Sequence, residues 1–395
     1  MSTISDLFSD LSPIDSVEPL DDEDASYSRD GIKPWDPGKI RITTKSFSLR
    51  DVVDQIKDGD IDLAPDFQRG YVWKPRQRTR LIESILLGIP LPAFYFNQAS
   101  DGKYQVVDGV QRLSTISLFM RDEHRLTAQD LEYIVDLDGL AYSELDPAAL
   151  RRFRSTQIVV HIIEPQTPDE VKYDIFSRVN TLGSPLSPQE IRHAMSKERS
   201  RQFIRTLVDS DEFEAATERQ YWRKDKATGD PIRDSGRMTD RELVLRFCAF
   251  RSFSIEDYRQ YASLDAYLIE FTRRLDGVSE HGAFLDQDLA KLDQDFRRAM
   301  VNAHEILGKA AFRRWPLTLD RRGPINRALF EAQGNALADQ PLNRLLPHRE
   351  AITTAFRAAF DNPAYLRAVT VGTGDPNGVA LRLETTRAIL AKVLG

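Results

Sequence analysis

The residues best suited to chemistry lie between Asp108 and Arg112, where an apolar stretch ends in Asp-Gly and a helical pattern begins at once. A helix N-terminus exposes unpaired backbone N–H groups and a partial positive charge, which suit a phosphate. Gly109 allows close backbone approach or positive φ, and Arg112 could donate to two phosphate oxygens. Gln111 could bind phosphate or orient a water, and Asp108 could cap the helix or hold Mg²⁺. A plain strand–turn–helix corner explains the pattern equally well.

The second group of candidate residues is Gln68 and Arg69, which are followed in the sequence by a glycine and two large aromatic residues, Tyr71 and Trp73. Arginine next to aromatic rings suits a nucleotide, because the cation can bind phosphate and a ring can stack on the base. For Trp73 the alternative is a place in the core, because its indole carries a large apolar area.

A third group follows a predicted helix that ends near Arg178 and Asn180, before a loop rich in glycine, serine and proline. Together with Arg192, these side chains could converge on an anionic ligand. Ser187 and Glu190 have the spacing of a capping box, with a proline at the first helical position, and this favours a structural role for both.

Two further patterns offer weaker alternatives. Asp146, Glu170 and Lys172 could hold Mg²⁺ and activate a water, as in a nuclease, but an acid at a helix start is also favoured by the helix dipole. Three arginine pairs between residues 297 and 322 form the most basic region and could contact a DNA backbone. Interspersed acidic residues favour a solvated, locally paired face there instead.

The sequence lacks the motifs of P-loop ATPases, of H-E-x-x-H metalloproteases and of G-x-S-x-G hydrolases, and this excludes those classes. The chain has no G-x-x-x-x-G-K-[ST] loop, no H-E-x-x-H and no G-x-S-x-G. The single cysteine, Cys248, excludes an internal disulfide, fits a reducing cytoplasm and is expected to be an inert core thiol. The N-terminus does not resemble a signal peptide, and the most apolar run, residues 81–96, is too interrupted to cross a bilayer. We therefore expect a cytoplasmic protein without a membrane partner.

Length and charge indicate two or three domains. The 395 residues are 41% hydrophobic and 29% charged, which suits soluble globular domains. The net charge of −7 comes from the N-terminus, because residues 1–36 hold ten acidic and two basic residues. The rest of the chain is nearly neutral, so an anionic partner for it stays possible. We expect a disordered acidic arm over residues 1–38, an α+β domain over 39–200 and an all-α domain over 201–395.

The elements that must position the candidate residues follow from hydrophobic periodicity and helix stop signals. In the first half, helices are predicted over 47–59, 74–88, 111–120, 168–179 and 189–195, with a further helix within 127–156. Extended segments are predicted over 61–67, 91–97, 104–107 and 158–163. In the second half, helices are predicted over 201–208, 240–250, 264–275, 289–307, 325–338, 349–360 and 379–394.

Four stretches, taken in order, resemble one known family. DFQRGYVW, LIESILLGIPLP, YQVVDGVQRLSTI and FSRVNTLGSPLSPQEIR are similar to the GmrSD-type restriction endonuclease N-terminal domain, whose fold is similar to that of ParB and sulfiredoxin. The resemblance is strong over residues 45–200, and the stretch RMTDREL at 237–243 is weaker but also family-like. The combination is specific, although each piece alone would not be.

The resemblance implies nucleotide binding and hydrolysis at an Asp-Gly-Gln-Gln-Arg motif, in systems that restrict foreign or modified DNA. Carried onto the matching positions, Asp108, Gly109, Gln111 and Arg112 become the phosphate and hydrolysis site. Gln68, Arg69 and Asn180 become its neighbours. The sequence departs from the family at one motif position, where a valine replaces the usual glutamine; this departure could weaken hydrolysis and leave binding intact.

A second departure concerns the nuclease. Many members carry a C-terminal His-Asn-His nuclease domain, but the six histidines of this chain are scattered and form no metal-ligand cluster. We therefore expect an Mg²⁺-dependent, NTP-binding and NTP-hydrolysing component of a prokaryotic restriction or anti-phage system. Its partners would be a nucleoside triphosphate, and also DNA or a separately encoded nuclease or ATPase. The alternatives are a non-catalytic adaptor that binds DNA or protein, or a stand-alone nuclease.

Overall fold

The computed structural model describes residues 36–63, 73–99, 101–179, 187–224, 229–233, 237–251 and 253–395. The chain divides into two compact units after Met195, near the predicted domain boundary. We call Lys33–Met195 the N-terminal unit and Ser196–Gly395 the C-terminal unit. Most of the predicted acidic arm, residues 1–35, lies outside the described residues.

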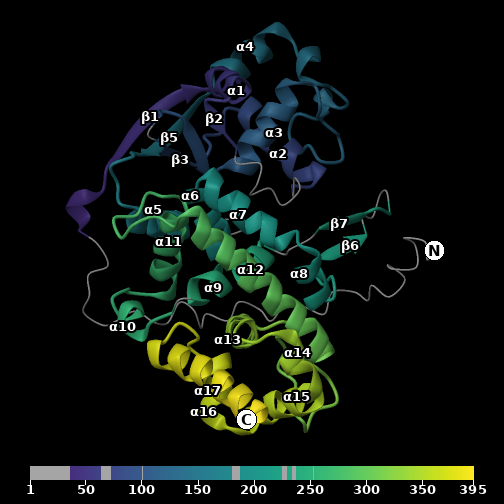
Figure 1. The fold of residues 1–395 in the computed structure, drawn as a ribbon. Coiled ribbons are helices and arrows are strands. Elements are labelled where there is room, and N and C mark those ends of the chain that lie inside the picture. Colours follow the sequence, from purple (N-terminus) through teal and green to yellow (C-terminus); the bar gives the residue numbers. More distant parts are fainter. Residues whose placement is uncertain are drawn as a thin grey trace. The chain divides into compact units, whose positions relative to one another are not determined.

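The N-terminal unit is built on a mixed sheet of five strands, with α1, α2 and α3 against one face (Figure 1). The strand order is β1-β5-β3-β4-β2, in which β1/β5 and β3/β4 are antiparallel and β5/β3 and β4/β2 are parallel. The strands are β1 (Ile42–Ser48), β2 (Ile61–Asp62), β3 (Phe94–Gln98), β4 (Tyr104–Asp108) and β5 (Gln157–Ile163). The α-helices are α1 (Leu49–Asp58), α2 (Pro75–Leu86), α3 (Val110–Met120), α4 (Pro147–Ser155), α5 (Asp169–Val179) and α6 (Pro188–Met195).

Local signals in the sequence explain where these helices begin and end. The Ser48 hydroxyl accepts the N–H of Asp51 at 3.1 Å to start α1, and Gly59 ends that helix in the left-handed region. The capping box at the start of α6 is confirmed, because Ser187 N–H donates to Glu190 and Glu190 N–H donates to the Ser187 hydroxyl.

A buried carboxylate fixes the long connection between α3 and α4. Glu83 on α2 is 3% exposed. Its Oε1 accepts the backbone N–H groups of residues 132, 133 and 134 at 2.9, 2.7 and 3.2 Å. Three charge-assisted hydrogen bonds in a buried setting hold this irregular segment on α2, where a hydrophobic pattern alone would not place it.

The C-terminal unit is largely helical, as predicted, and it also contains a short strand pair that was not predicted. Trp222–Lys224 (β6) and Pro231–Arg233 (β7) pair as a short antiparallel ribbon. Strands of three residues are too short for an alternating pattern to show in the sequence. The α-helices are α7 (Glu198–Val208), α8 (Asp211–Ala216), α9 (Thr239–Arg251), α10 (Ile255–Tyr258), α11 (Leu264–Leu275), α12 (Asp286–Asn302), α13 (Arg327–Ala338), α14 (Leu342–Leu345), α15 (Arg349–Ala358), α16 (Pro363–Thr370) and α17 (Pro376–Leu394). No helix within the described ranges is long and apolar enough to span a membrane.

A buried ionic cluster joins three helices of the C-terminal unit. Glu331 on α13 accepts from Arg246 of α9 at 3.0 Å and from Arg382 of α17 at 2.6 Å. All three side chains are fully buried. Arg246 also lies 3.5 Å from Glu242, which in turn pairs with Arg327 at 3.1 Å. The carboxylate of Glu331 is thus the shared counter-charge of two guanidinium groups that water does not reach.

Removing this counter-charge should destabilise the fold strongly. We expect Glu331→Gln to lower the free energy of unfolding by about 3–5 kcal/mol, because the buried Arg382 loses its carboxylate partner and Arg246 keeps only the longer contact with Glu242. Glu305→Gln, at a side chain that is 46% exposed, should change it by less than about 0.5 kcal/mol. Urea denaturation followed by circular dichroism measures both, and equal losses for the two variants would contradict the role of the cluster.

Candidate functional site

The predicted phosphate corner lies where β4 passes into α3. Gly109 is the N-cap of α3 and has φ 101°, in the left-handed region. A Cβ atom on this residue would lie 2.2 Å from Cδ1 and 2.7 Å from Cε1 of the Phe94 ring. Glycine is therefore required here both by the backbone angle and by the ring that packs beneath the turn.

The guanidinium of Arg112 folds back onto this corner. Its Nη2 lies 2.7 Å from Oδ2 of Asp108. It also donates to the carbonyl oxygens of Pro92 at 2.5 Å and Ala93 at 3.3 Å, and its Cζ lies 4.1 Å from the centroid of the Phe94 ring. We call this set of contacts the Arg112 clamp. It ties the first turn of α3 to the end of β4 and to the segment that enters β3.

The clamp leaves Arg112 little access to solvent. Its side chain is 13% exposed, against 30% for Asp108. Burial raises the pKa of the Asp108 carboxyl, while the Arg112 cation and the Gly109 N–H act in the opposite direction. Burial also lowers the pKa of Arg112, against the favourable charge of Asp108. A phosphate that used this guanidinium would have to compete with Asp108 for it.

The start of α3 keeps donors available beside the clamp. The helix has no side-chain N-cap, and its first backbone bond runs from Leu113 N–H to the Gly109 carbonyl. Among the described residues, no acceptor takes the N–H groups of Val110, Gln111 or Arg112. The Oε1 atom of Gln111 is buried and also has no hydrogen-bond donor within the described part of the chain. The three N–H groups are the kind of donor that suits an anion, whereas the Gln111 oxygen can only accept a hydrogen bond.

Most of the other predicted ligands fall on residues that the structure does not describe. Gln68, Arg69, Tyr71 and Asn180 lie outside the described residues. Arg178 lies exposed in the last turn of α5.

The two remaining candidates have structural contacts. Trp73 is half-buried against the core of the N-terminal unit, and its carbonyl accepts from Arg78. Arg192 is 2% exposed, and its Nε donates to Gln189 at 3.0 Å. Base stacking by Trp73 stays a prediction, as do the roles of the four undescribed residues.

The weaker alternatives show local structural roles. Asp146 caps α4 by accepting the N–H groups of Ala148 and Ala149 at 2.8 and 2.9 Å, and these bonds lower the pKa of its carboxyl. Lys172 lies 3.7 Å from Asp169. The side chain of Glu170 is not described. Within the described ranges, no three His, Cys, Asp or Glu side chains cluster as a metal site.

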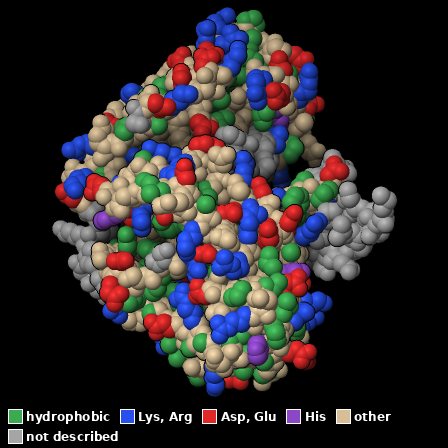
Figure 2. All heavy atoms as spheres, viewed as in Figure 1, with side chains coloured by type: hydrophobic (Ala, Val, Ile, Leu, Met, Phe, Trp, Pro, Cys, Tyr) green, Lys and Arg blue, Asp and Glu red, His purple; other side chains and the backbone are tan. Residues whose placement is uncertain are grey.

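The basic region of the C-terminal unit is locally paired, as its interspersed acids indicate. Basic and acidic side chains alternate over the face shown in Figure 2. Ion pairs join Arg297 to Asp293 and Glu212, Arg298 to Asp295, and both Arg313 and Arg322 to Glu218. These arginines are therefore engaged within the protein, which weakens their case as a DNA-binding surface.

Phe94 and the two carbonyls before it are the partners that the sequence analysis missed. The Asp108–Arg112 pair itself had a visible signal, because residues four apart face each other on a helix or at its start. The partners from residues 92–94 had no such signal, since they are brought close only by the β3/β4 pairing, which sets Tyr95 opposite Asp108.

The close packing of Gly109 on Phe94 can be tested against a matched glycine. Gly59 also has positive φ, but nothing lies within 4 Å of a Cβ placed there. We expect Gly59→Ala to cost about 1–2 kcal/mol of stability from backbone strain alone. Gly109→Ala should cost about 1–3 kcal/mol more, because of the clash with the ring. Thermal and urea unfolding measure the difference, and equal costs would contradict the close approach.

Comparison with known proteins identifies the domain that holds this corner. Residues 49–197 match the family model described as the GmrSD restriction endonuclease, N-terminal domain, in agreement with the resemblance expected over 45–200. No curated protein matches the chain. One solved structure with a detectable likeness is the "C2221 form of Pnob8-like ParB-N domain", at 11% identity and a TM-score of 0.22, over 90% of this chain and 99% of that one. Residues 49–197 of this chain are thus a GmrSD restriction endonuclease N-terminal domain.

Proposed function

We propose that this domain binds a nucleoside triphosphate with Mg²⁺ and hydrolyses it, as a component of a prokaryotic DNA-restriction system. The observation that carries the proposal is the start of α3, where three successive N–H groups have no acceptor among the described residues. Such a helix start favours a phosphate. The restriction context is supported by the family of the domain.

In this proposal the phosphates bind at the N-terminus of α3 and compete with Asp108 for Arg112. A polyphosphate carries several negative charges, so it can replace one carboxylate as the partner of a guanidinium. Arg112 would then neutralise charge that develops on the transferred phosphoryl group. Opening of the Asp108–Arg112 pair is thus a required step of binding.

Asp108 and Gln111 supply the remaining groups. Mg²⁺ in phosphoryl-transfer sites is held by one or two carboxylates together with the phosphates and water. The carboxylate of Asp108, once released from Arg112, fits that donor set. The Gln111 amide oxygen has no protein donor among the described residues, and it could accept a hydrogen bond from the attacking water.

The alternative is a non-catalytic adaptor that works with a separately encoded ATPase or nuclease. Two observations favour it. The Arg112 clamp is closed, and Val110 stands where the family motif has a glutamine. The Val110 side chain packs against the core of the N-terminal unit, so it offers no polar group to a nucleotide.

Nucleotide binding by the full chain tests the proposal. We expect the wild-type protein to bind radiolabelled NTPs with Mg²⁺ and to release phosphate. Arg112→Gln should weaken binding at least about tenfold, because a charge-assisted pair is lost. Arg121→Gln, at an exposed arginine at the other end of α3, should bind as the wild type does.

Thermal unfolding of each variant separates loss of ligand from loss of fold. Binding without turnover would support the adaptor. A folded wild-type protein that neither binds nor hydrolyses any NTP would exclude nucleotide chemistry at this corner.

The family departure at position 110 gives a gain-of-function test. We expect Val110→Gln to raise phosphate release by up to about a hundredfold, because a correctly placed polar group orients water or nucleotide, and to leave nucleotide affinity nearly unchanged. Val135→Gln, at a valine that is 50% exposed, should leave both properties unchanged. Unaltered turnover in Val110→Gln, with nucleotide bound, would show that this residue does not limit hydrolysis.

A further inference from the structure

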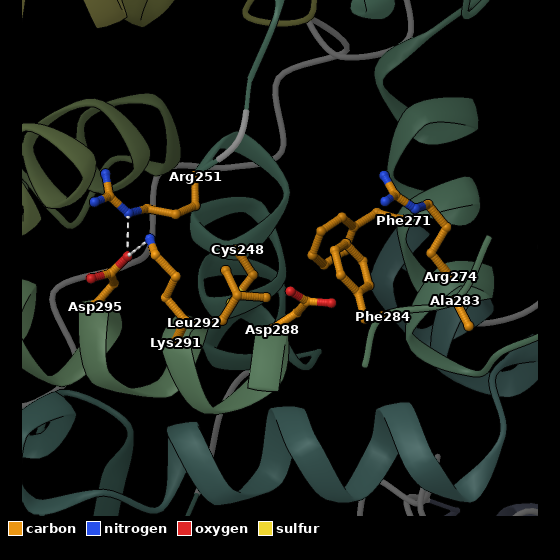
Figure 3. Close-up of a pocket in the computed structure, with 10 residues that line it drawn as sticks. All are labelled: Cys248, Arg251, Phe271, Arg274, Ala283, Phe284, Asp288, Lys291, Leu292 and Asp295. Atoms are coloured by element: carbon orange, nitrogen blue, oxygen red, sulfur yellow. Dashed lines mark hydrogen bonds and ion pairs between the residues drawn. The ribbon is translucent and has the colours of Figure 1, made fainter. Parts of the chain in front are cut away.

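The C-terminal unit contains a cavity of about 190 Å³ that is separate from the corner described above. It lies among α9, α11, α12 and the loop that precedes α12 (Figure 3). Its apolar lining comes from Phe271, Phe284, Leu292 and Cys248. An engineered apolar cavity of about 150 Å³ holds one benzene molecule, so this space suits a single ring with a small substituent.

One cation of the lining has no carboxylate partner in the part of the chain that the structure describes. Arg274 stacks on the Phe284 ring, with its Cζ 4.4 Å from the ring centroid. Its Nε is buried without a hydrogen-bond partner, and no carboxylate of the described residues pairs with its guanidinium. A guanidinium in this state retains donors for an anionic ligand, and its planar fork matches a carboxylate.

The other charged groups of the lining are already satisfied. Asp295 accepts from Arg251 at 2.9 Å and from Lys291 at 3.3 Å, as the dashed lines in Figure 3 show. Arg251 also pairs with Asp339 at 2.7 Å. Asp288 accepts the Leu285 N–H at 2.9 Å in the first turn of α12, where the helix dipole stabilises its charge. The cation left over for a ligand is therefore Arg274.

The aromatic wall beside Arg274 is held in place before any ligand enters. Phe284 packs on Phe271, with ring centroids 5.1 Å apart. Its carbonyl accepts from Arg199 at 2.8 Å, and the same guanidinium donates to the Leu275 carbonyl at 2.9 Å. Arg199 thus ties the loop to the end of α11. A preformed site loses less conformational entropy when it binds.

We propose that this cavity binds a small organic carboxylate with a flat apolar body. The carboxylate pairs with Arg274, and the body packs against Phe271, Phe284 and Leu292. This inference is independent of nucleotide binding, because it uses a different unit of the chain and a different cation.

Benzoate is the probe, and benzamide is its neutral counterpart of the same shape. Saturation-transfer NMR and calorimetry on the full chain should show that benzoate binds at least about tenfold more tightly than benzamide, because only benzoate forms a charge-assisted pair with Arg274. Arg274→Gln should remove this preference. Arg344→Gln, at an exposed arginine of the same unit, should keep it.

A second variant keeps the test decisive if Arg274→Gln unfolds. Ala283 lines the cavity and is exposed, so Ala283→Leu should obstruct the cavity without removing a charge. We expect it to weaken benzoate binding at least about tenfold, the same loss as for Arg274→Gln. Absence of benzoate binding in the wild type, equal affinities for benzoate and benzamide, or benzoate binding unchanged in Ala283→Leu would each overturn the proposal.

Discussion

The Arg112 clamp is the interaction that fixes the conformation of the corner between β4 and α3. One guanidinium, from the start of α3, meets a carboxylate at the end of β4 and, from the contiguous residues 92–94, two carbonyl oxygens and an aromatic face. Because the clamp needs the chain to turn directly above Phe94, it also requires a residue without a side chain at position 109. The conformation of this corner therefore follows from packing as much as from any demand of a ligand.

That constraint changes how the motif is understood. From the sequence, Arg112 is a cation available to phosphate; in the structure it is an internal cross-link that a phosphate would have to open. When the cation of a binding site is held in an internal ion pair, ligand binding can be coupled to a local change of structure. Here Asp108 and the carbonyls of Pro92 and Ala93 would lose Arg112 as a partner when a ligand binds it. Nucleotide binding and conformational change would then be one event.

Much of the fold could be predicted because local signals agree with the final structure. Gly59 ends α1 and Pro75 begins α2 as expected, and α11 has the predicted bounds. Strand β1 had no such signal, because apolar and polar residues do not alternate regularly along it and several of its side chains are exposed.

The site could be predicted only in part. The spacing of Asp108 and Arg112 is local, whereas the approach of Phe94 depends on strand pairing across the sheet.

Cys248 has a practical consequence. It is the chain's single cysteine, it is 1% exposed, and burial raises the pKa of its thiol. Both properties make it a slow nucleophile. If one cysteine were introduced on the surface of each unit, a thiol-reactive fluorescent dye or spin label would therefore attach to these two residues with little labelling of Cys248. The wild-type background can thus serve directly for measuring distances between the two units, with and without ligands.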